Sequence, residues 1–238
     1  MTQKPNVLLL FSDEHNSNVA GYAGDPIAQT KALDSIAAEG VWLKNAYCQS
    51  PICTPSRMSI LTGKEIRNCS SWNNHWVLFP EHKTIANQFY ESGYATALIG
   101  KMHFGGKDQY HGFQERPYGD LHHGLGHQPD PIDMFPNSGG VRHAAASQIP
   151  ESLQQEPIVS RETASWILEH KSANPRQPWF VCASFCKPHA PLTCPARYLR
   201  KYHGNVPEVC LGSDDSAVNH PYAATQRENY GLTDITPE

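Results

Sequence analysis

NVLLLFS, residues 6–12, is the stretch that decides the fold. It is a continuous apolar run of strand length, and such runs are typical of strands that are covered on both faces within a parallel sheet. Two later runs have the same character, Tyr94–Ile99 and Trp179–Phe185. Segments with helical spacing lie between these runs. The sequence therefore predicts an α/β fold, in which helices flank a doubly wound, mainly parallel sheet.

The expected helices end at Gly or at basic residues, which commonly close a helix. They are the segment from Ala32 to Gly40, Thr84–Ser92 before Gly93, and Ser160–Lys171 with Ser160 as its cap. We also expect a strand at Val41–Tyr47. Residues 105–158 are rich in Gly, Pro and His and show no sustained period, so we interpret them as a long excursion that helps to wall a pocket.

The composition excludes several classes of protein. The 238 residues include 19 Lys and Arg against 23 Asp and Glu, a net charge of −4 without any block of like charge. We therefore expect neither a nucleic-acid interface nor a membrane partner. The apolar run Val7–Phe11 is too short for a signal-peptide core or a membrane span, which predicts a cytoplasmic protein. Its seven cysteines are then expected to be reduced thiols.

Chemically active side chains follow each of the three predicted strands. The apolar runs lead into residues 13–16 (Asp-Glu-His-Asn), 100–103 (Gly-Lys-Met-His) and, after Cys186, 187–189 (Lys-Pro-His). Ligands bind beyond the carboxyl ends of the strands in open parallel sheets, so we expect these groups to meet at one rim. The plain alternative is that polar residues follow strands because loops are solvated.

Cys53 precedes another predicted helix. Thr54 suits its N-cap, Pro55 its first position and Gly63 its stop. The start of a helix favours an anion, and Arg57 lies one turn further along, where its guanidinium can bind an oxyanion. A phosphatase with a low-pKa thiol is one interpretation, although the three residues between Cys53 and Arg57 are few for its phosphate loop. A buried structural cysteine is the other.

These motifs together resemble those of a known family. Cys53-Thr54-Pro55-Ser56-Arg57 is similar to the C-[TS]-P-x-R signature of the type I sulfatases, which use formylglycine and belong to the alkaline-phosphatase-like superfamily. Three other segments resemble that family in the same order along the chain: Pro5–Asp13, its first strand and metal aspartate; Gly100–Gly105, its G-K-x-H-x-G segment; and Ser184–Pro191, its S-F-x-x-P-H-x-P segment.

The resemblance implies the alkaline-phosphatase-like fold and hydrolysis of a sulfate monoester of a small molecule or sugar. It implies that a formylglycine-generating maturation enzyme oxidises Cys53, and that the hydrated aldehyde attacks sulfur. Lys101 would neutralise the sulfate oxygens, and Arg57 would hold the surroundings of the nucleophile. His189 would assist the leaving oxygen. His103 would take a proton from the second hydroxyl so that sulfate is released.

The resemblance also implies a divalent cation bound by Asp13, Glu14 and the residue derived from Cys53. Ca²⁺ is the expected ion, with Mg²⁺ or Mn²⁺ as alternatives. Many family members have Asp-Asp where this chain has Asp13-Glu14. The family supplies further metal ligands and a Lys from a later strand, so residues 1–238 resemble the amino-terminal portion of a single catalytic domain that is incomplete at its C-terminus. We expect this portion alone to bind metal weakly and to turn over poorly.

Two other functions remain open from the sequence. A phosphonate or phosphate ester hydrolase could use the same scaffold, because tetrahedral oxyanions share charge and shape. A truncated homologue could instead serve only as a binding module. Two weaker interpretations concern other residues. A structural zinc site could use Cys182, Cys186, His189 and Cys194. An aromatic wall of the substrate pocket could use Trp72, His75 and Trp76.

Overall fold

The structure is a computed structural model that describes residues 4–119, 144–190, 192–206 and 220–233. The chain divides into two compact units. The first comprises residues 1–14, 42–128 and 152–187, and the second residues 15–41, 129–151 and 188–238. Each unit is described by itself.

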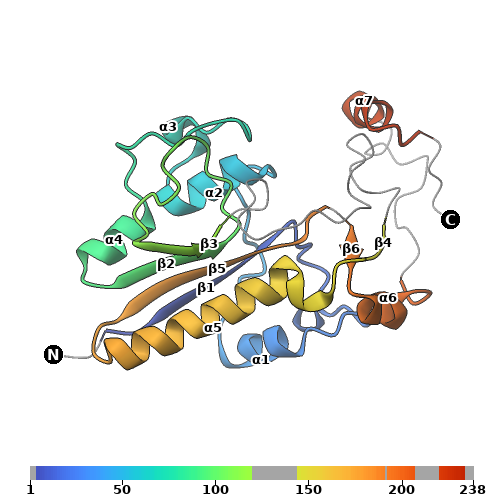
Figure 1. Cartoon of the computed structure of the whole chain (residues 1–238). Coiled ribbons are helices and arrows are strands. Elements are labelled where there is room, and N and C mark those ends of the chain that lie inside the picture. The colour runs from blue at the N-terminus through green and yellow to red at the C-terminus, as the bar shows by residue number, and fades with distance from the viewer. Residues whose placement is uncertain (1–3, 120–143, 191, 207–219, 234–238) are drawn as a thin grey trace. The chain divides into compact units, whose positions relative to one another are not determined.

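A four-stranded sheet forms the centre of the first unit (Figure 1). Its order is β1-β5-β2-β3, and β2 runs parallel to both of its neighbours. The pairing of β2 with β5 extends from Ala95 opposite Trp179 to Gly100 opposite Ser184. The strands are β1 (Val7–Asp13), β2 (Ala95–Gly100), β3 (Glu115–Tyr118) and β5 (Trp179–Pro188). The predicted parallel α/β sheet is confirmed.

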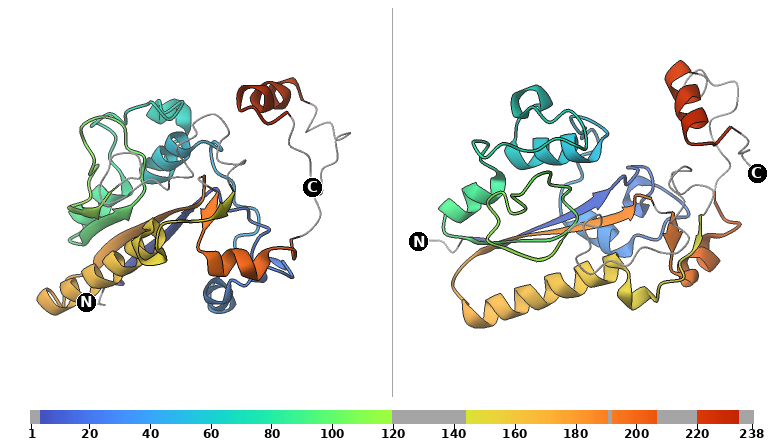
Figure 2. Two further views of the ribbon diagram at one scale, coloured as in Figure 1. Left: turned by 45° about the vertical axis from the view of Figure 1, so that its right-hand side comes forward. Right: turned by 45° about the horizontal axis from the view of Figure 1, so that its top comes forward.

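Helices cover both faces of this sheet (Figures 1 and 2). On one face lie α2 (Cys53–Thr62), α3 (Ile66–Cys69) and α4 (Ile85–Glu91). On the other face lies α5 (Gln155–Ala173), which follows the 3-10 turn η5 (Glu151–Leu153).

The side chains of β2 and β5 alternate between two apolar clusters, as strand geometry requires. Leu98 and Phe180 face the α2 and α4 side, where they pack with Met58 and Leu61. Ile99 and Val181 face the opposite side, where they pack with Val159 and Trp166 of α5. Burial on both faces explains why β2 is apolar except for Thr96, which is also buried.

The second unit contains short elements. They are η1 (Gly21–Ala23), α1 (Lys31–Glu39), α6 (Ala196–Tyr202), α7 (Pro221–Asn229), and the parallel pair β4 (Ala145–Ala146) and β6 (Thr193–Cys194). None of the helices that the structure describes is long and apolar enough to cross a membrane.

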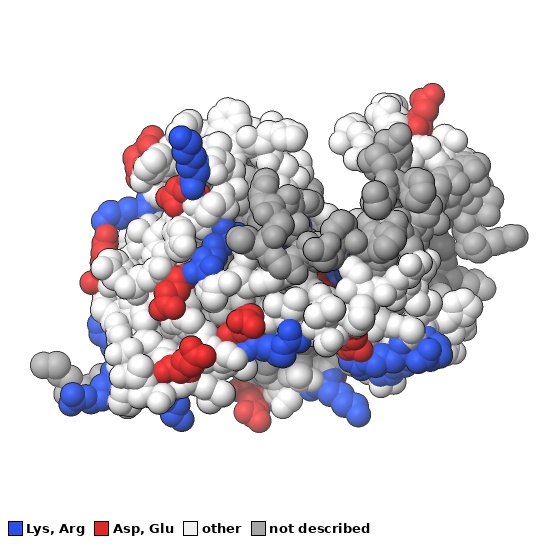
Figure 3. All heavy atoms as spheres, in the orientation of Figure 1, with Lys and Arg blue, Asp and Glu red and all other residues white. Residues whose placement is uncertain are grey.

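Lys and Arg are interspersed with Asp and Glu on the face drawn in Figure 3.

Four details differ from the sequence prediction. The predicted strand Val41–Tyr47 is wrong: its residues join no ladder, and Val41 and Tyr47 are 85% and 90% exposed. A strand needs a partner for its backbone groups, and apolar residues alone do not supply one. Helix α5 begins at Gln155 instead of Ser160, because Pro157 lies in the first turn, where its missing N–H costs nothing.

The third difference is that α2 begins at Cys53 itself, with Ile52 as its N-cap. The prediction that Thr54 caps this helix is therefore wrong. The fourth is β3, which the sequence did not reveal. It has four residues, includes Pro117, and lies at an edge of the sheet, where proline is tolerated. Strands β3 and β4 and the start of α5 lie in the predicted excursion 105–158, of which residues 120–143 lie outside the described residues.

Gly100 ends β2 at a point where no side chain fits. Its φ is +98°, and an added Cβ would collide with the Ser184 carbonyl oxygen and lie 2.9 Å from Val159 Cγ2. We expect Gly100→Ala to lower the free energy of unfolding by about 3 kcal/mol or more, because strain and overpacking add. Urea unfolding measures this.

Gly93→Ala is the matched control. Gly93 also has positive φ, +85°, but an added Cβ would meet nothing within 4 Å. It should therefore cost only the conformational strain, about 1–2 kcal/mol. Equal losses for the two variants would contradict a steric role for Gly100.

Candidate active site

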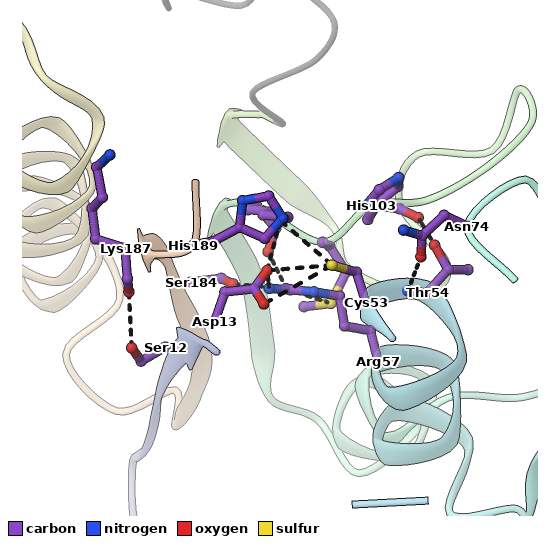
Figure 4. Close-up of polar contacts among 12 residues, drawn as sticks. Ser12, Asp13, Cys53, Thr54, Arg57, Asn74, His103, Ser184, Lys187 and His189 are labelled. Carbon is purple, nitrogen blue, oxygen red and sulfur yellow. Dashed lines mark hydrogen bonds and ion pairs between the residues drawn. The ribbon is translucent and has the colours of Figure 1, made fainter. Parts of the chain in front are cut away.

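Two groups from different elements contact the sulfur of Cys53, and Figure 4 shows one of them, Asp13, beside it. Asp13 is the last residue of β1, Lys101 follows β2, and Cys53 is the first residue of α2. Lys101 Nζ lies 3.7 Å from Cys53 Sγ, and the Asp13 carboxylate oxygens lie 3.7 and 3.9 Å from the same sulfur. Because the carboxyl ends of parallel strands share one edge, the topology brings these residues together.

Arg57 is the buried support of this cluster. It is 2% exposed, one turn after Cys53 in α2. Its Nη2 donates to Asp13 Oδ2 at 2.9 Å, and its Nη1 donates to the Lys101 carbonyl oxygen at 2.6 Å and to Ser184 Oγ at 3.1 Å. Its guanidinium carbon also lies 4.8 Å from the centre of the Phe11 ring. These contacts fix Arg57 and tie α2 to the end of β1, to the residue after β2 and to the middle of β5.

Positive charge exceeds negative charge in the cluster. Lys101 is fully buried, and its Nζ forms a second ion pair with Asp13 Oδ2 at 2.6 Å. Burial raises the pKa of Asp13, but the Lys101 hydrogen bond and the charges of Arg57 and Lys101 outweigh it, so the pKa lies below its usual value of 3.8. One carboxylate thus faces two cations. This buried excess of positive charge favours binding of an anion beside Cys53.

The start of α2 adds to this preference. The first N–H groups of a helix have no partner within the helix. Asn74 Oδ1 accepts one of them, from Thr54 N at 3.0 Å. Thr54 Oγ1 also donates to the carbonyl oxygen of His103 at 3.2 Å. His103 has φ of +59°, a left-handed conformation that non-glycine residues adopt rarely. The structure thus places His103 on the loop that packs against α2.

Two of the predicted site residues, Glu14 and His189, are not among the contacts described above. Glu14 is exposed and has φ of +56°. His189 comes directly after β5 and belongs to the second unit. Its part in the chemistry, like the metal ligation by Glu14, stays a prediction.

Sequence reasoning gave no role to two residues that contact the cluster. Ser184 belongs to a quoted motif, but its contact with Arg57 depends on the register of β5 against β2. Asn74 lies between the residues of the proposed aromatic wall, and no local pattern indicates that its side chain reaches α2. Trp72 itself is 55% exposed.

The alternative zinc set gains no support. Cys182 is fully buried within the apolar cluster of β5, and burial raises the pKa of its thiol to about 12, partly offset by the charge of Arg57. A metal needs the thiolate, which this environment disfavours.

Comparison with known proteins shows the family to which the chain belongs. The model of the family described as Sulfatase matches residues 5–230. The chain belongs to the sulfatase family. The sulfatase YidJ of Escherichia coli K12 is 29% identical over 228 residues, which are 92% of this chain and 45% of that protein. This sulfatase-family chain spans about half the length of the curated relatives it matches.

Two solved structures show the same alkaline-phosphatase-like fold. The phosphonate monoester hydrolase of Agrobacterium radiobacter has a TM-score of 0.71 at 20% identity, over 93% of this chain and 49% of that one. A protein in complex with its substrate D-glucosamine-2-N,6-O-disulfate has a TM-score of 0.66 at 20% identity, over 87% of this chain and 40% of that one. At this identity the likeness shows the fold.

Sulfatases generally use a metal ion and a formylglycine, and the residues around Cys53 fit part of such a site. Asp13 is the buried carboxylate that the described residues place beside Cys53. Its oxygens are the hard ligands that Ca²⁺ prefers, but that ion takes about 6–8 of them. Asp13 therefore fits as one oxygen ligand of a cation site, which needs further ligands from other residues.

Proposed function

We propose that this chain is the amino-terminal portion of a single catalytic domain that hydrolyses a sulfate monoester of a small molecule or sugar. One observation carries the proposal: Cys53 begins α2 with its sulfur 3.7 Å from the buried Lys101 ammonium, in a cluster with two cations and one carboxylate. A sulfate ester needs such charge compensation on its oxygens as its S–O bond breaks.

The nucleophile is proposed to be the hydrated formylglycine derived from Cys53, which supplies a hydroxyl that attacks sulfur and a second hydroxyl that permits release of sulfate. Lys101 is poised to bind the sulfate oxygens from its buried position. Arg57 holds Asp13 and the Lys101 backbone in place. In this proposal His103 accepts a proton from the nucleophilic residue, and His189 gives one to the leaving alcohol.

Asp13, with Glu14 and the residue at 53, would hold the divalent cation, for which we propose Ca²⁺ with Mg²⁺ and Mn²⁺ as alternatives. When bound there, a cation would supply Lewis-acid polarisation of the reacting oxygens.

A comparison of esters tests the reaction class. The full-length protein is produced together with a formylglycine-generating enzyme, and kcat/KM is measured on matched aryl sulfate and aryl phosphonate esters. We expect a preference for the sulfate of about tenfold or more. A preference for the phosphonate would assign the chain to phosphonate hydrolysis. Failure to hydrolyse either ester, with calcium and sulfate binding retained in calorimetry, would leave a binding module.

A further inference from the structure

The end of β5 is held by side chains from two other elements. Lys187 N donates to Glu156 Oε1 at 3.0 Å, and the Lys187 carbonyl oxygen accepts from Ser12 Oγ at 3.0 Å (Figure 4 shows the second bond). Glu156 lies in the first turn of α5, and Ser12 lies in β1. Both backbone polar groups of Lys187 are therefore satisfied by side chains.

These contacts begin where the strand ladder with β2 stops. The register of β5 against β2 ends with Ser184 opposite Gly100. Lys187 lies three residues further along, and the next residue is Pro188, which has no N–H to donate. At Lys187, Ser12 of β1 bonds the carbonyl oxygen and Glu156 of α5 accepts the N–H, so the carboxylate of Glu156 is the anchor for that backbone N–H.

The residues that follow Lys187 and Ser12 in the sequence include two residues with proposed catalytic or metal-binding roles. His189, the proposed proton donor, is two residues after Lys187, and Asp13 follows Ser12. The Lys187 backbone thus links the ends of the strands that supply these two residues. Displacing a catalytic group by 1 Å can lower a rate about a hundredfold, so the anchor of this segment bears on catalysis.

We propose that Glu156 is a positioning residue: by accepting the Lys187 N–H, it fixes the end of β5 and so orients His189 toward the leaving alcohol. This inference rests on the proposed function. A purely structural role is the competing explanation, since an acidic residue in the first turn also stabilises a helix. The two roles predict different losses of kcat/KM. A positioning role lowers the rate mainly for a leaving group that needs a proton, whereas a structural role lowers it equally for all leaving groups.

The test uses the full-length, matured protein and two aryl sulfates. One has an activated nitrophenol leaving group, which needs little proton donation, and the other has an unactivated phenol. Glu156→Ala removes the acceptor. We expect it to lower kcat/KM on the phenyl sulfate by about ten- to a hundredfold. On the nitrophenyl sulfate we expect a loss of less than about threefold, because that leaving group departs without full protonation.

Two variants control for folding and charge. Glu156→Gln keeps an acceptor oxygen at the same place and should restore phenyl sulfate hydrolysis to within about threefold of wild type. Glu169→Ala removes an exposed carboxylate from the same helix and should leave both rates unchanged. Hydrogen exchange at the Lys187 amide should be faster in Glu156→Ala than in Glu156→Gln.

Equal losses on the two sulfates, or no loss on either, would overturn the positioning role while leaving sulfate hydrolysis by the wild type intact. If the wild-type protein with a confirmed aldehyde at position 53 hydrolyses neither sulfate, the proposed function fails first and this inference falls with it.

Discussion

Replacing Cys53 with alanine is expected to abolish sulfate-ester hydrolysis, with a loss in kcat of about 10⁴-fold or more. The variant removes the thiol that the maturation enzyme must oxidise to form the aldehyde, while Lys101, Arg57 and Asp13 stay in place. Their charge should still attract a sulfate ester, so KM should change much less than kcat. Steady-state kinetics of the full-length, matured protein on an aryl sulfate measures both constants.

Cys48→Ala is the matched control, because Cys48 is a free and exposed cysteine five residues earlier in the chain. Its activity should equal that of the wild type. Residual hydrolysis by Cys53→Ala at one tenth of the wild-type rate would place the nucleophile elsewhere and remove the basis of the mechanism.

The second large effect is expected at Lys101. Lys101→Met keeps a long side chain but removes the buried ammonium that contacts Cys53 and Asp13. We expect kcat/KM on an aryl sulfate to fall by about 10²–10³-fold, because the charge that develops on sulfate loses its partner. The variant should also lower the free energy of unfolding by about 3 kcal/mol, since one ion pair of a buried network is broken.

Lys107→Met controls for the loss of a lysine from the same loop region, since Lys107 is exposed. Kinetics and urea unfolding of both variants separate the role of Lys101 in catalysis from its role in stability. A large loss of stability with unchanged kcat/KM would make Lys101 a structural residue and contradict its proposed contact with substrate.

Much of the fold follows from local sequence. The three apolar runs became the strands β1, β2 and β5. Both faces of β2 and β5 are buried, but β1 packs only the face of Val7, Leu9 and Phe11. The prediction that β1 is covered on both faces is wrong, because Leu8 and Leu10 are 44% and 48% exposed. Gly63 closes α2 with φ of +65°, as its position predicted. The strand expected at Val41–Tyr47 failed because hydrophobicity does not provide a pairing partner.

The site was less accessible to sequence reasoning. The grouping of Asp13 with Lys101 follows from parallel topology, which alternating strands and helices predict. The double ion pair of Asp13 and the contact of Arg57 with Ser184 depend on register and rotamers, which no spacing rule fixes. The left-handed backbone of His103 is equally a tertiary outcome, since it depends on neighbours distant in sequence.

The most direct test of the account is the mass of the tryptic peptide that contains position 53, taken from protein produced in a host with the maturation enzyme. We expect an aldehyde at that position, in equilibrium with its hydrate, and reaction of the peptide with a hydrazine probe. An unmodified thiol in every molecule, from a host that matures another sulfatase in parallel, would contradict it.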